Sequence, residues 1–297
     1  MELEIGLEDG DTHIGMEFGN INYIMNDYLR VRGGKFLLPL GFWKEKMHPE
    51  WINKLPTPPL PYADEEHPVI PPADLGIDIR GAVPIGTFFG RLAVPMVLAY
   101  DFWVGNGPDE KDGNIHFGTN YNDNNNNKAF GGRVSFRPWP YREIGISGMR
   151  GQWNNNHHGG HVSSKKNLYY NALVFEWDWR LWKYFRFLGE YMWTQRDAVI
   201  NPKEDIFSRN IFERGVWAQA SLDMGLTHTA ILENFELIAR YGNVDSDIHK
   251  RKCGQWSFGI DYYINNQMIV KASYDVNHGN VASTRNNTFW LQWAYGY

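Results

Sequence analysis

The C-terminal segment Asn286–Tyr297 reads NNTFWLQWAYGY and alternates in side-chain character at every position but Trp290. One parity holds Phe289, Leu291, Trp293, Tyr295 and Tyr297, and the other holds Thr288, Gln292, Ala294 and Gly296. Successive side chains of a strand point to opposite faces, so the segment predicts a strand with one continuous aromatic and aliphatic face. Chain ends are usually polar, so this face is expected to meet a large apolar surface.

The same period of two recurs along most of the chain, whereas helical periodicity is nearly absent. The segment QWSFGIDYYI (255–264) separates an apolar parity from a polar one. An amide-rich turn and a second alternating segment, 268–277, follow it and predict a hairpin. In all, fourteen strands of about ten residues each are expected. They start near Glu2, Ile14, Tyr28, Leu75, Leu92, Phe130, Glu143, Leu168, Phe185, Val216, Phe235, Gln255, Met268 and Thr288.

The expected connections alternate between short and long. Short turns fall at 25–27, 84–91, 138–142, 180–184, 227–234 and 265–267, and long polar loops at 38–74, 106–128, 154–167, 196–214, 244–254 and 278–287. A β-sandwich with irregular loops does not require this order. Outer-membrane β-barrels do, because tight turns close one end of the barrel and large loops the other.

Composition narrows the class further. The chain has 297 residues, 43% of them hydrophobic, a net charge of −5 and a single cysteine, Cys253. No segment approaches the roughly 20 apolar residues of a membrane-spanning helix, and the charge predicts no nucleic-acid partner. The start MELEIGLEDG has no signal-peptide pattern, so the chain is either cytoplasmic or a mature or truncated form. The strand pattern favours the second interpretation.

Aromatic residues gather near the ends of the expected strands, and smaller aliphatic residues occupy the middles. This is the two-belt pattern of a bilayer-spanning barrel. The expected belt residues are Tyr100, Phe102, Trp103, Trp139, Tyr141, Trp177, Trp179, Trp182, Tyr184, Tyr191, Trp193, Tyr262 and Tyr263. The sequence therefore predicts an all-β, closed antiparallel transmembrane β-barrel of fourteen strands in one domain, 1–297. Sixteen strands are expected if N-terminal strands are missing.

The opposite parity carries many charges, which are costly in a dry interior and are expected to line a water-filled lumen. The predicted pore-lining residues are Arg30, Arg32, Arg80, Arg133, Arg137, Arg186, Arg240, Lys271, Glu17, Asp78, Asp101, Glu176, Glu190 and Asp261. Five of them, Arg30, Arg32, Arg80, Arg133 and Arg137, are expected to face Glu17, Asp78 and Asp101 across the lumen and to set a transverse field.

Asn26–Pro61 carries a specific phrase, formed by Arg32, Gly34, Lys35, Phe36, Pro39 and Gly41 and followed by a loop rich in tryptophan and proline. It resembles the "R-x-GKF-x-x-PFG" phrase of Gram-negative porins related to the phosphate-selective porin O/P group. The hairpin at 259–277 is similar to the penultimate hairpin of that group. The C-terminal Tyr297 resembles the signal by which the barrel-assembly machinery recognises such proteins.

The resemblance implies an outer-membrane homotrimer, surrounded by lipid, that allows passive diffusion of solutes, but it does not identify the solute. Small hydrophilic solutes or anions are the expected partners. Two departures limit it. Members of the group are usually longer, with sixteen strands, and their anion selectivity depends on dense arginine and lysine ladders, whereas the predicted lumen here carries mixed charge with more acids than bases.

The Pro-rich loop 38–74 is long enough to be functional. It is expected to fold into the pore and narrow it, with Lys44, Lys46 and Lys54 offered to passing anions. A cap that merely shields the barrel is the alternative.

Other chemistry finds little support. His157, His158 and His161 lie among asparagine and glycine, which favours a flexible loop over a metal site. The oxygen-rich tract Asp109–Asn114 lacks EF-hand spacing, and no nucleophile motif appears. No metal, cofactor or enzymatic activity is therefore expected. The sequence predicts a porin-type channel; a non-conducting carbohydrate-binding β-sheet protein and a barrel acting as an adhesin or receptor remain as alternatives.

Overall fold

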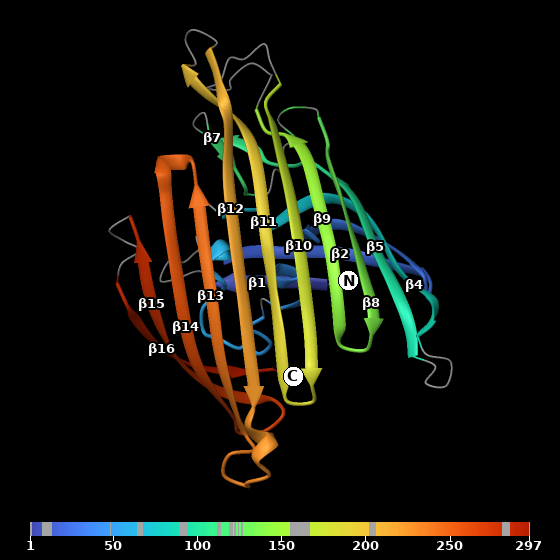
Figure 1. The fold of residues 1–297 in the computed structure, drawn as a ribbon. Helices are drawn as coiled ribbons and strands as arrows, with labels where there is room; N and C mark the ends of the chain where they lie inside the picture. Colours follow the sequence, from blue (N-terminus) through green and yellow to red (C-terminus); the bar gives the residue numbers. More distant parts are fainter. Residues whose placement is uncertain are drawn as a thin grey trace.

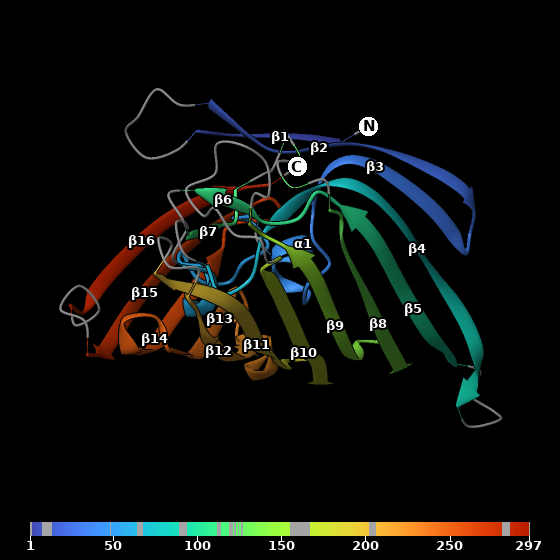
Figure 2. The same ribbon diagram turned by 90° about the horizontal axis from the view of Figure 1, so that it is seen from above.

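The computed structural model describes residues 2–7, 14–47, 49–63, 68–88, 94–111, 114–118, 121, 123, 125, 127–154, 167–201, 206–280 and 286–296. One antiparallel sheet of fourteen strands dominates it, and a separate pair, β6 (Asp109–Lys111) and β7 (Asn114–His116), forms a second small sheet. Figure 1 shows the long strands side by side, and Figure 2 shows that they curve round a central space.

Neighbours in the large sheet follow chain order throughout. Its strands are β1 (Glu2–Leu7), β2 (Ile14–Asn26), β3 (Leu29–Leu37), β4 (Ala73–Phe88), β5 (Val94–Gly105), β8 (Ala129–Trp139), β9 (Arg142–Gln152), β10 (Tyr169–Trp182), β11 (Phe185–Asn201), β12 (Ile206–Asp223), β13 (Phe235–Ser246), β14 (Arg251–Tyr263), β15 (Met268–Gly279) and β16 (Thr288–Tyr295). The short helices are α1 (Trp43–Lys46), η1 (Leu60–Tyr62), η2 (Met224–Thr227) and η3 (Ile248–Lys250). Among the described helices, none is long and apolar enough to cross a bilayer.

The predicted strand positions agree with the large sheet, with three differences. Strand β12 begins ten residues before the expected Val216, because the pairing of β11 with β12 continues to Asn201 and Ile206. Strands β6 and β7 were not predicted, so the described strands exceed fourteen in total. The predicted closed barrel is not seen: in the described part of the chain no ladder joins β1 to β16, and the sheet is open at these two edges.

The two faces of the sheet differ as the alternation predicts. On β16, the exposed fractions of Phe289, Leu291 and Trp293 are 65%, 71% and 63%, whereas Ala294 on the opposite parity is buried. Strand β14 repeats the pattern, with Phe258 exposed on the outer face and Asp261 buried on the inner face. A soluble sandwich would bury the apolar face against a second sheet, so this exposure contradicts the carbohydrate-binding sandwich as a fold.

The segment from Leu38 to Pro72 lies on the inner face and carries α1 and η1. Figure 2 places α1 inside the curve of the sheet, away from its convex side. The segment reaches widely separated strands, since Gly41 contacts Ser147 of β9 and Asn53 contacts Lys271 of β15. The fold therefore encloses a loop that the sequence could place only as a candidate.

Part of this interior is dry, which corrects the expectation of a uniformly wet lumen. Val174, Leu188 and Met192 point inward from β10 and β11 and belong to one buried apolar cluster with Phe42 and Trp43 of the loop. Burying such side chains stabilises the fold by roughly 1.5–3 kcal/mol each. The loop is thus packed against this wall as a hydrophobic core would be.

Two of the expected belt residues also lie elsewhere. Trp103 is fully buried, on the same inward parity as Asp101, and Tyr263 bonds to Glu236 inside the sheet. Both share a parity with polar neighbours, so the face of the strand, and not its end, determines their position.

Candidate functional site

Glu190 of β11 is the main anchor of the inner loop. Its Oε1 accepts hydrogen bonds from the backbone N–H groups of Phe42 (2.5 Å) and Trp43 (2.9 Å). Its Oε2 accepts bonds from the Tyr62 hydroxyl (2.7 Å) and the Trp217 indole N–H (2.8 Å). A buried carboxylate is tolerated only when it is well bonded, and here four donors from the loop and β12 surround it. Glu190 therefore joins two separate parts of the loop, at Phe42–Trp43 and at Tyr62, to the wall.

Two glycines of the segment Arg32–Gly41 have positive φ angles, and one of them, Gly41, lies against Glu190. Gly41 has φ +73°, and a Cβ at this position would collide with the Glu190 carboxylate. Gly34 has φ +123°, and a Cβ there would meet the backbone oxygen of Gly19 on the neighbouring strand. Both positions favour glycine because L side chains rarely adopt positive φ.

Arg32 and Arg80 form a charged cluster with Glu45 of α1. Glu45 Oε1 lies 3.2 Å from Arg32 Nη1 and 2.6 Å from Arg80 Nη2. Arg32 also donates to Asp78 through Nε (2.9 Å), and Arg80 donates to Asp101 (3.1 Å). The predicted transverse field is therefore wrong for these groups, because each arginine is bonded to acids on its own or an adjacent strand.

A second cluster joins Lys46 of α1 to β8, β9 and β10. Arg133 donates to Glu176 (2.9 Å) and to Glu143 (2.8 Å), and Arg137 donates to Glu143 (2.9 Å). Lys46 lies 3.3 Å from the same Glu143. Phe42, Lys46, Glu143 and Glu176, with Trp177 and Asp178, line a hollow of about 210 Å³ beside α1.

The middle of the loop is held by two buried cations of the opposite wall. Arg240 donates to the carbonyl oxygens of Thr57 (2.8 Å) and Pro58 (3.0 Å) and to the Thr57 hydroxyl (2.9 Å). Lys271 donates to the carbonyl oxygens of Asn53 (2.6 Å) and Glu50. Both cations are almost completely buried, so they clamp the loop backbone and present no charge to solvent.

Lys54 pairs with Glu236 (2.8 Å) and contacts the Tyr263 hydroxyl, which itself donates to Glu236 (2.6 Å). Arg186 forms a two-bond pair with Asp178, at 2.8 and 2.6 Å. Asp261 is buried opposite Lys271 in the ladder. Lys54 and Arg186 are therefore engaged with acids of the inner side, whereas both carboxylate oxygens of Asp261 are buried without a hydrogen-bond partner among the described residues.

Three of the predicted residues remain outside these clusters. Arg30 is exposed on the inner parity of β3, directly opposite Arg80 in the ladder. Lys44 contacts the Trp43 ring at 5.9 Å, and Glu17 is exposed on β2. Within the described residues, neither Arg30 nor Lys44 has an ion pair.

The loop carries two groups with shifted pKa values. Burial alone would raise the pKa of Glu45, but the Arg80 and Arg32 guanidinium groups outweigh it and hold the pKa below its ordinary value of 4.5. Burial, together with the charge of Glu190, raises the pKa of Tyr62 well above its ordinary value. Glu45 is therefore held as a carboxylate and Tyr62 as a hydroxyl donor.

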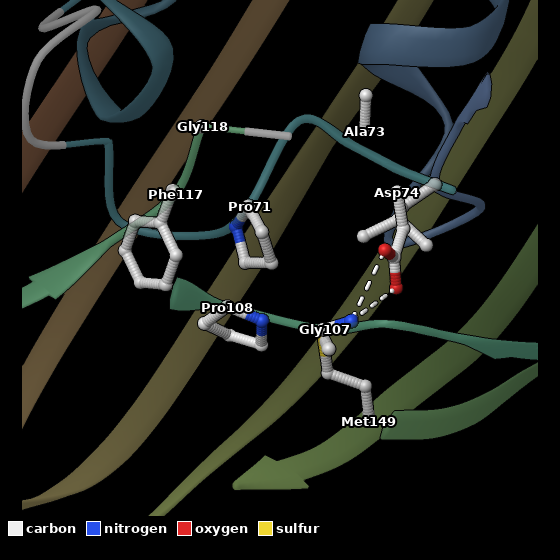
Figure 3. A pocket seen from close by; sticks show the side chains of 9 residues that line it. Pro71, Ala73, Asp74, Gly107, Pro108, Phe117, Gly118 and Met149 are labelled. Carbon is white, nitrogen blue, oxygen red and sulfur yellow. Dashed lines mark hydrogen bonds between the residues drawn. The ribbon is translucent and has the colours of Figure 1, made fainter. Parts of the chain in front are cut away.

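Where the loop returns to β4, a smaller hollow of about 180 Å³ lies among Leu38, Asp74, Pro108, Phe117 and Met149 (Figure 3). The Asp74 carboxylate accepts hydrogen bonds from the N–H groups of Leu75 (2.7 Å) and Gly107 (3.1 and 3.0 Å). Since its carboxylate is already satisfied by backbone donors, this hollow is a packing junction between two loops.

Several contact residues were not predicted, chiefly Glu45, Glu143, Ser147, Tyr62 and Trp217. One signal was present in the sequence: Trp217 shares its parity with Gln219 and Ser221, and Leu188 shares its parity with Arg186 and Glu190. A large apolar residue on a polar face indicates that something covers that face. The identity of the covering segment is not contained in this pattern.

No group of three metal-ligating side chains is present in the part of the chain that the structure describes. His157, His158 and His161, together with Tyr297, lie outside the described residues.

No protein-family model matches the sequence, and no curated protein matches it significantly. Among solved structures, the chain is similar to an anion-selective porin from Comamonas acidovorans, with a TM-score of 0.56 and 11% identity over 96% of this chain and 76% of that chain. It is also similar to the outer-membrane expressed OmpT of Vibrio cholerae, with a TM-score of 0.53 and 9% identity over 90% of this chain and 71% of that chain. At these identities the likeness shows that the chain has the all-β antiparallel fold of these outer-membrane proteins.

Proposed function

We propose that this chain is a porin-type protein of a Gram-negative outer membrane that allows passive diffusion of small hydrophilic solutes, with a preference for anions. The observation that carries the proposal is the orientation of the sheet. Apolar side chains cover its convex face, whereas charged side chains and the Leu38–Pro72 segment occupy its inner face. This arrangement suits lipid outside and a polar path inside.

Closure of the barrel is part of the proposal. The free edges of β1 and β16 carry unpaired backbone groups, and each such group costs several kcal/mol in hydrocarbon. We therefore expect the two edges to be joined when the protein lies in a bilayer. Assembly as a homotrimer and recognition of Tyr297 by the barrel-assembly machinery are further proposals that rest on the family resemblance. Chemical cross-linking in native membranes tests the trimer.

The preference for anions rests on which partner of each ion pair remains accessible. Around Glu143, the side chains of Lys46 and Arg137 are each 44% exposed, whereas the carboxylate side chain is 14% exposed. Arg80 is likewise more exposed than Asp101, whereas Arg186 and Asp178 are similar. The order is reversed for the two buried arginines, because Arg32 and Arg133 are less exposed than Glu45 and Glu143. Long basic side chains extend their charge to water, while their short acidic partners stay near the backbone. The accessible surface beside α1 is therefore basic.

The loop is proposed to narrow the path, with Lys44 and Lys46 of α1 facing it. Lys54 has a different proposed role, because its ammonium group is bound to Glu236. The proposed solute path then passes beside α1, along the parts of the wall where Arg30 and Arg137 are exposed.

Planar-bilayer recording of the purified protein tests both the proposed channel and its proposed preference for anions. We expect stepwise conductance and, in a potassium chloride gradient, a reversal potential displaced toward the chloride equilibrium potential. Absence of steps would overturn the channel. Steps with a reversal potential displaced toward potassium would overturn the anion preference and leave the channel standing.

A further inference from the structure

Glu45 occupies the position that a small anion would take between two arginine side chains. One oxygen, Oε1, is shared by Arg32 Nη1 at 3.2 Å and Arg80 Nη2 at 2.6 Å. The two arginines come from adjacent strands, β3 and β4, whereas Glu45 comes from the loop. Paired guanidinium groups are well suited to carboxylates, because their N–H groups and charge match both oxygens.

The charged side chains of the β3–β5 wall carry one more positive than negative charge, so one monoanion would balance them. Arg30, Arg32 and Arg80 share the inner parity of β3 and β4. Asp78 pairs with Arg32 and Arg80, and Asp101 pairs with Arg80, whereas Arg30 has no ion pair among the described residues. Three cations therefore face two acids of the wall, and Glu45 supplies the third negative charge. Arg133 of β8 also acts on Glu45 but is already bonded to Glu143 and Glu176.

The backbone that carries Glu45 is held independently of its carboxylate. Glu190 binds the N–H groups of Phe42 and Trp43, and Ser147 accepts the N–H of Gly41 at 2.8 Å. The Glu45 side chain can therefore leave the two arginines by rotation, without release of the loop. The Arg80 side chain is 23% exposed, but its Nη2 atom is buried beside Glu45, so a solute can reach this atom only when the Glu45 carboxylate moves away.

We propose that Arg32 and Arg80, with Arg30 beside them, form a binding site for small carboxylate anions, and that Glu45 is its tethered internal occupant. The proposal rests on the proposed channel and names its solute class as monocarboxylates. A tethered group competes at an effective concentration in the millimolar range. Free carboxylates consequently bind weakly and leave readily, as transport requires.

Removal of the internal competitor tests the proposal. The Glu45→Gln variant keeps the shape of the side chain and removes its charge, so the site gains one uncompensated positive charge. We expect the acetate concentration that half-saturates the block of chloride current to fall by about tenfold in this variant. Glu50→Gln is the matched control, because Glu50 is an exposed carboxylate on the same loop whose side chain contacts Gln292.

A binding measurement that needs no current separates the two proposals. Saturation transfer to the methyl protons of acetate, recorded on detergent-solubilised protein, should increase in Glu45→Gln and not in Glu50→Gln. The gain should disappear when Arg80→Gln is added to Glu45→Gln. Equal acetate binding in all four proteins would overturn the carboxylate site, and stronger displacement of bound acetate by sulfate than by formate would overturn the assignment to monocarboxylates. Absent conductance with the expected binding would overturn the channel alone.

Discussion

The hydroxyl of Tyr62 donates a 2.7 Å hydrogen bond to Glu190, across 128 positions of the chain. Tyr62 lies in η1 near the end of the inner loop, while the same carboxylate binds Phe42 and Trp43 near its beginning. One wall residue therefore fixes both ends of a segment of about twenty residues. This relationship makes the position of the loop open to direct experiment.

The first prediction concerns Glu190. The Glu190→Gln variant keeps one acceptor oxygen but places an N–H₂ group against donors, so at least one buried donor loses its partner. We expect the free energy of unfolding, measured in denaturant, to fall by about 1–3 kcal/mol. In bilayers, we expect larger current steps or greater fluctuation of the current within each step. The exposed Glu233→Gln is the control and should change neither quantity. Unchanged steps in Glu190→Gln would contradict the role of the anchor.

The second prediction concerns Gly41. In Gly41→Ala the new methyl group collides with Glu190, and the positive φ is unfavourable for alanine. The loop should shift away from β11, so trypsin should cut after Lys44 or Lys46 faster than in the parent protein. Gly33→Ala, whose Cβ would meet no atom within 4 Å, is the matched control. Equal cleavage rates in both variants would show that the loop accommodates the methyl group.

The third prediction concerns the clamp on the other side. Arg240→Met removes the charge that binds the carbonyl oxygens of Thr57 and Pro58 and leaves these acceptors buried. We expect about 1–3 kcal/mol of destabilisation and an increase in current fluctuation. Lys252→Met on β14 replaces a basic side chain that is mostly exposed and should leave both properties unchanged. If Arg240→Met had the stability of the parent protein and no additional current fluctuation, Arg240 would not be required to hold the loop in place.

The fourth prediction is a pH dependence that originates at Glu45. Its pKa is lowered in the folded protein, so its contribution to the docking of α1 is fully present above about pH 4.5 and is lost as the pH falls through the lowered value. Unfolding in denaturant should show a decrease in stability over this acidic range. The Glu45→Gln variant should show a smaller decrease, since it has no carboxylate to protonate at this position. An identical pH profile in the two proteins would exclude Glu45 as a source.

The fifth prediction tests the outer face. Phe258 lies near the middle of β14, with its side chain 53% exposed. If this face contacts lipid, Phe258→Arg should destabilise the protein in a bilayer by about 2–4 kcal/mol, seen as reduced folding into vesicles. Tyr121→Arg, at an exposed position outside the sheet, is the control. Normal folding of Phe258→Arg would contradict a membrane location for this face.

The order of the strands and their two faces could be predicted because both depend on local information. Alternation fixes which side chains share a face, as in Phe289, Leu291 and Trp293, and connection length fixes which strands pair as neighbours. The starts of β11, β13, β15 and β16 were therefore predicted to the residue. The first ten residues of β12, 206–215, were not predicted as strand because charged and small residues interrupt the apolar ones there.

The partners of the charged residues were not predictable in this way. Alternation placed Glu190, Arg240 and Lys271 on the inner face but gave no information about what they bind there. Their partners are main-chain groups of a loop more than a hundred positions away, brought close only by the curvature of the sheet. For the same reason the sequence predicted wet, mutually facing charges where the structure has buried, locally bonded ones.

The sequence by itself thus determined the all-β class, the strand order and the division into an apolar and a charged face. These properties follow from a side-chain period of two residues, which is a feature of the chain alone. The tertiary structure decided that the loop lies inside, which charges are clamped, and that Glu45 occupies the arginine pair. Those outcomes depend on contacts between segments distant in sequence, where packing and charge compensation act together.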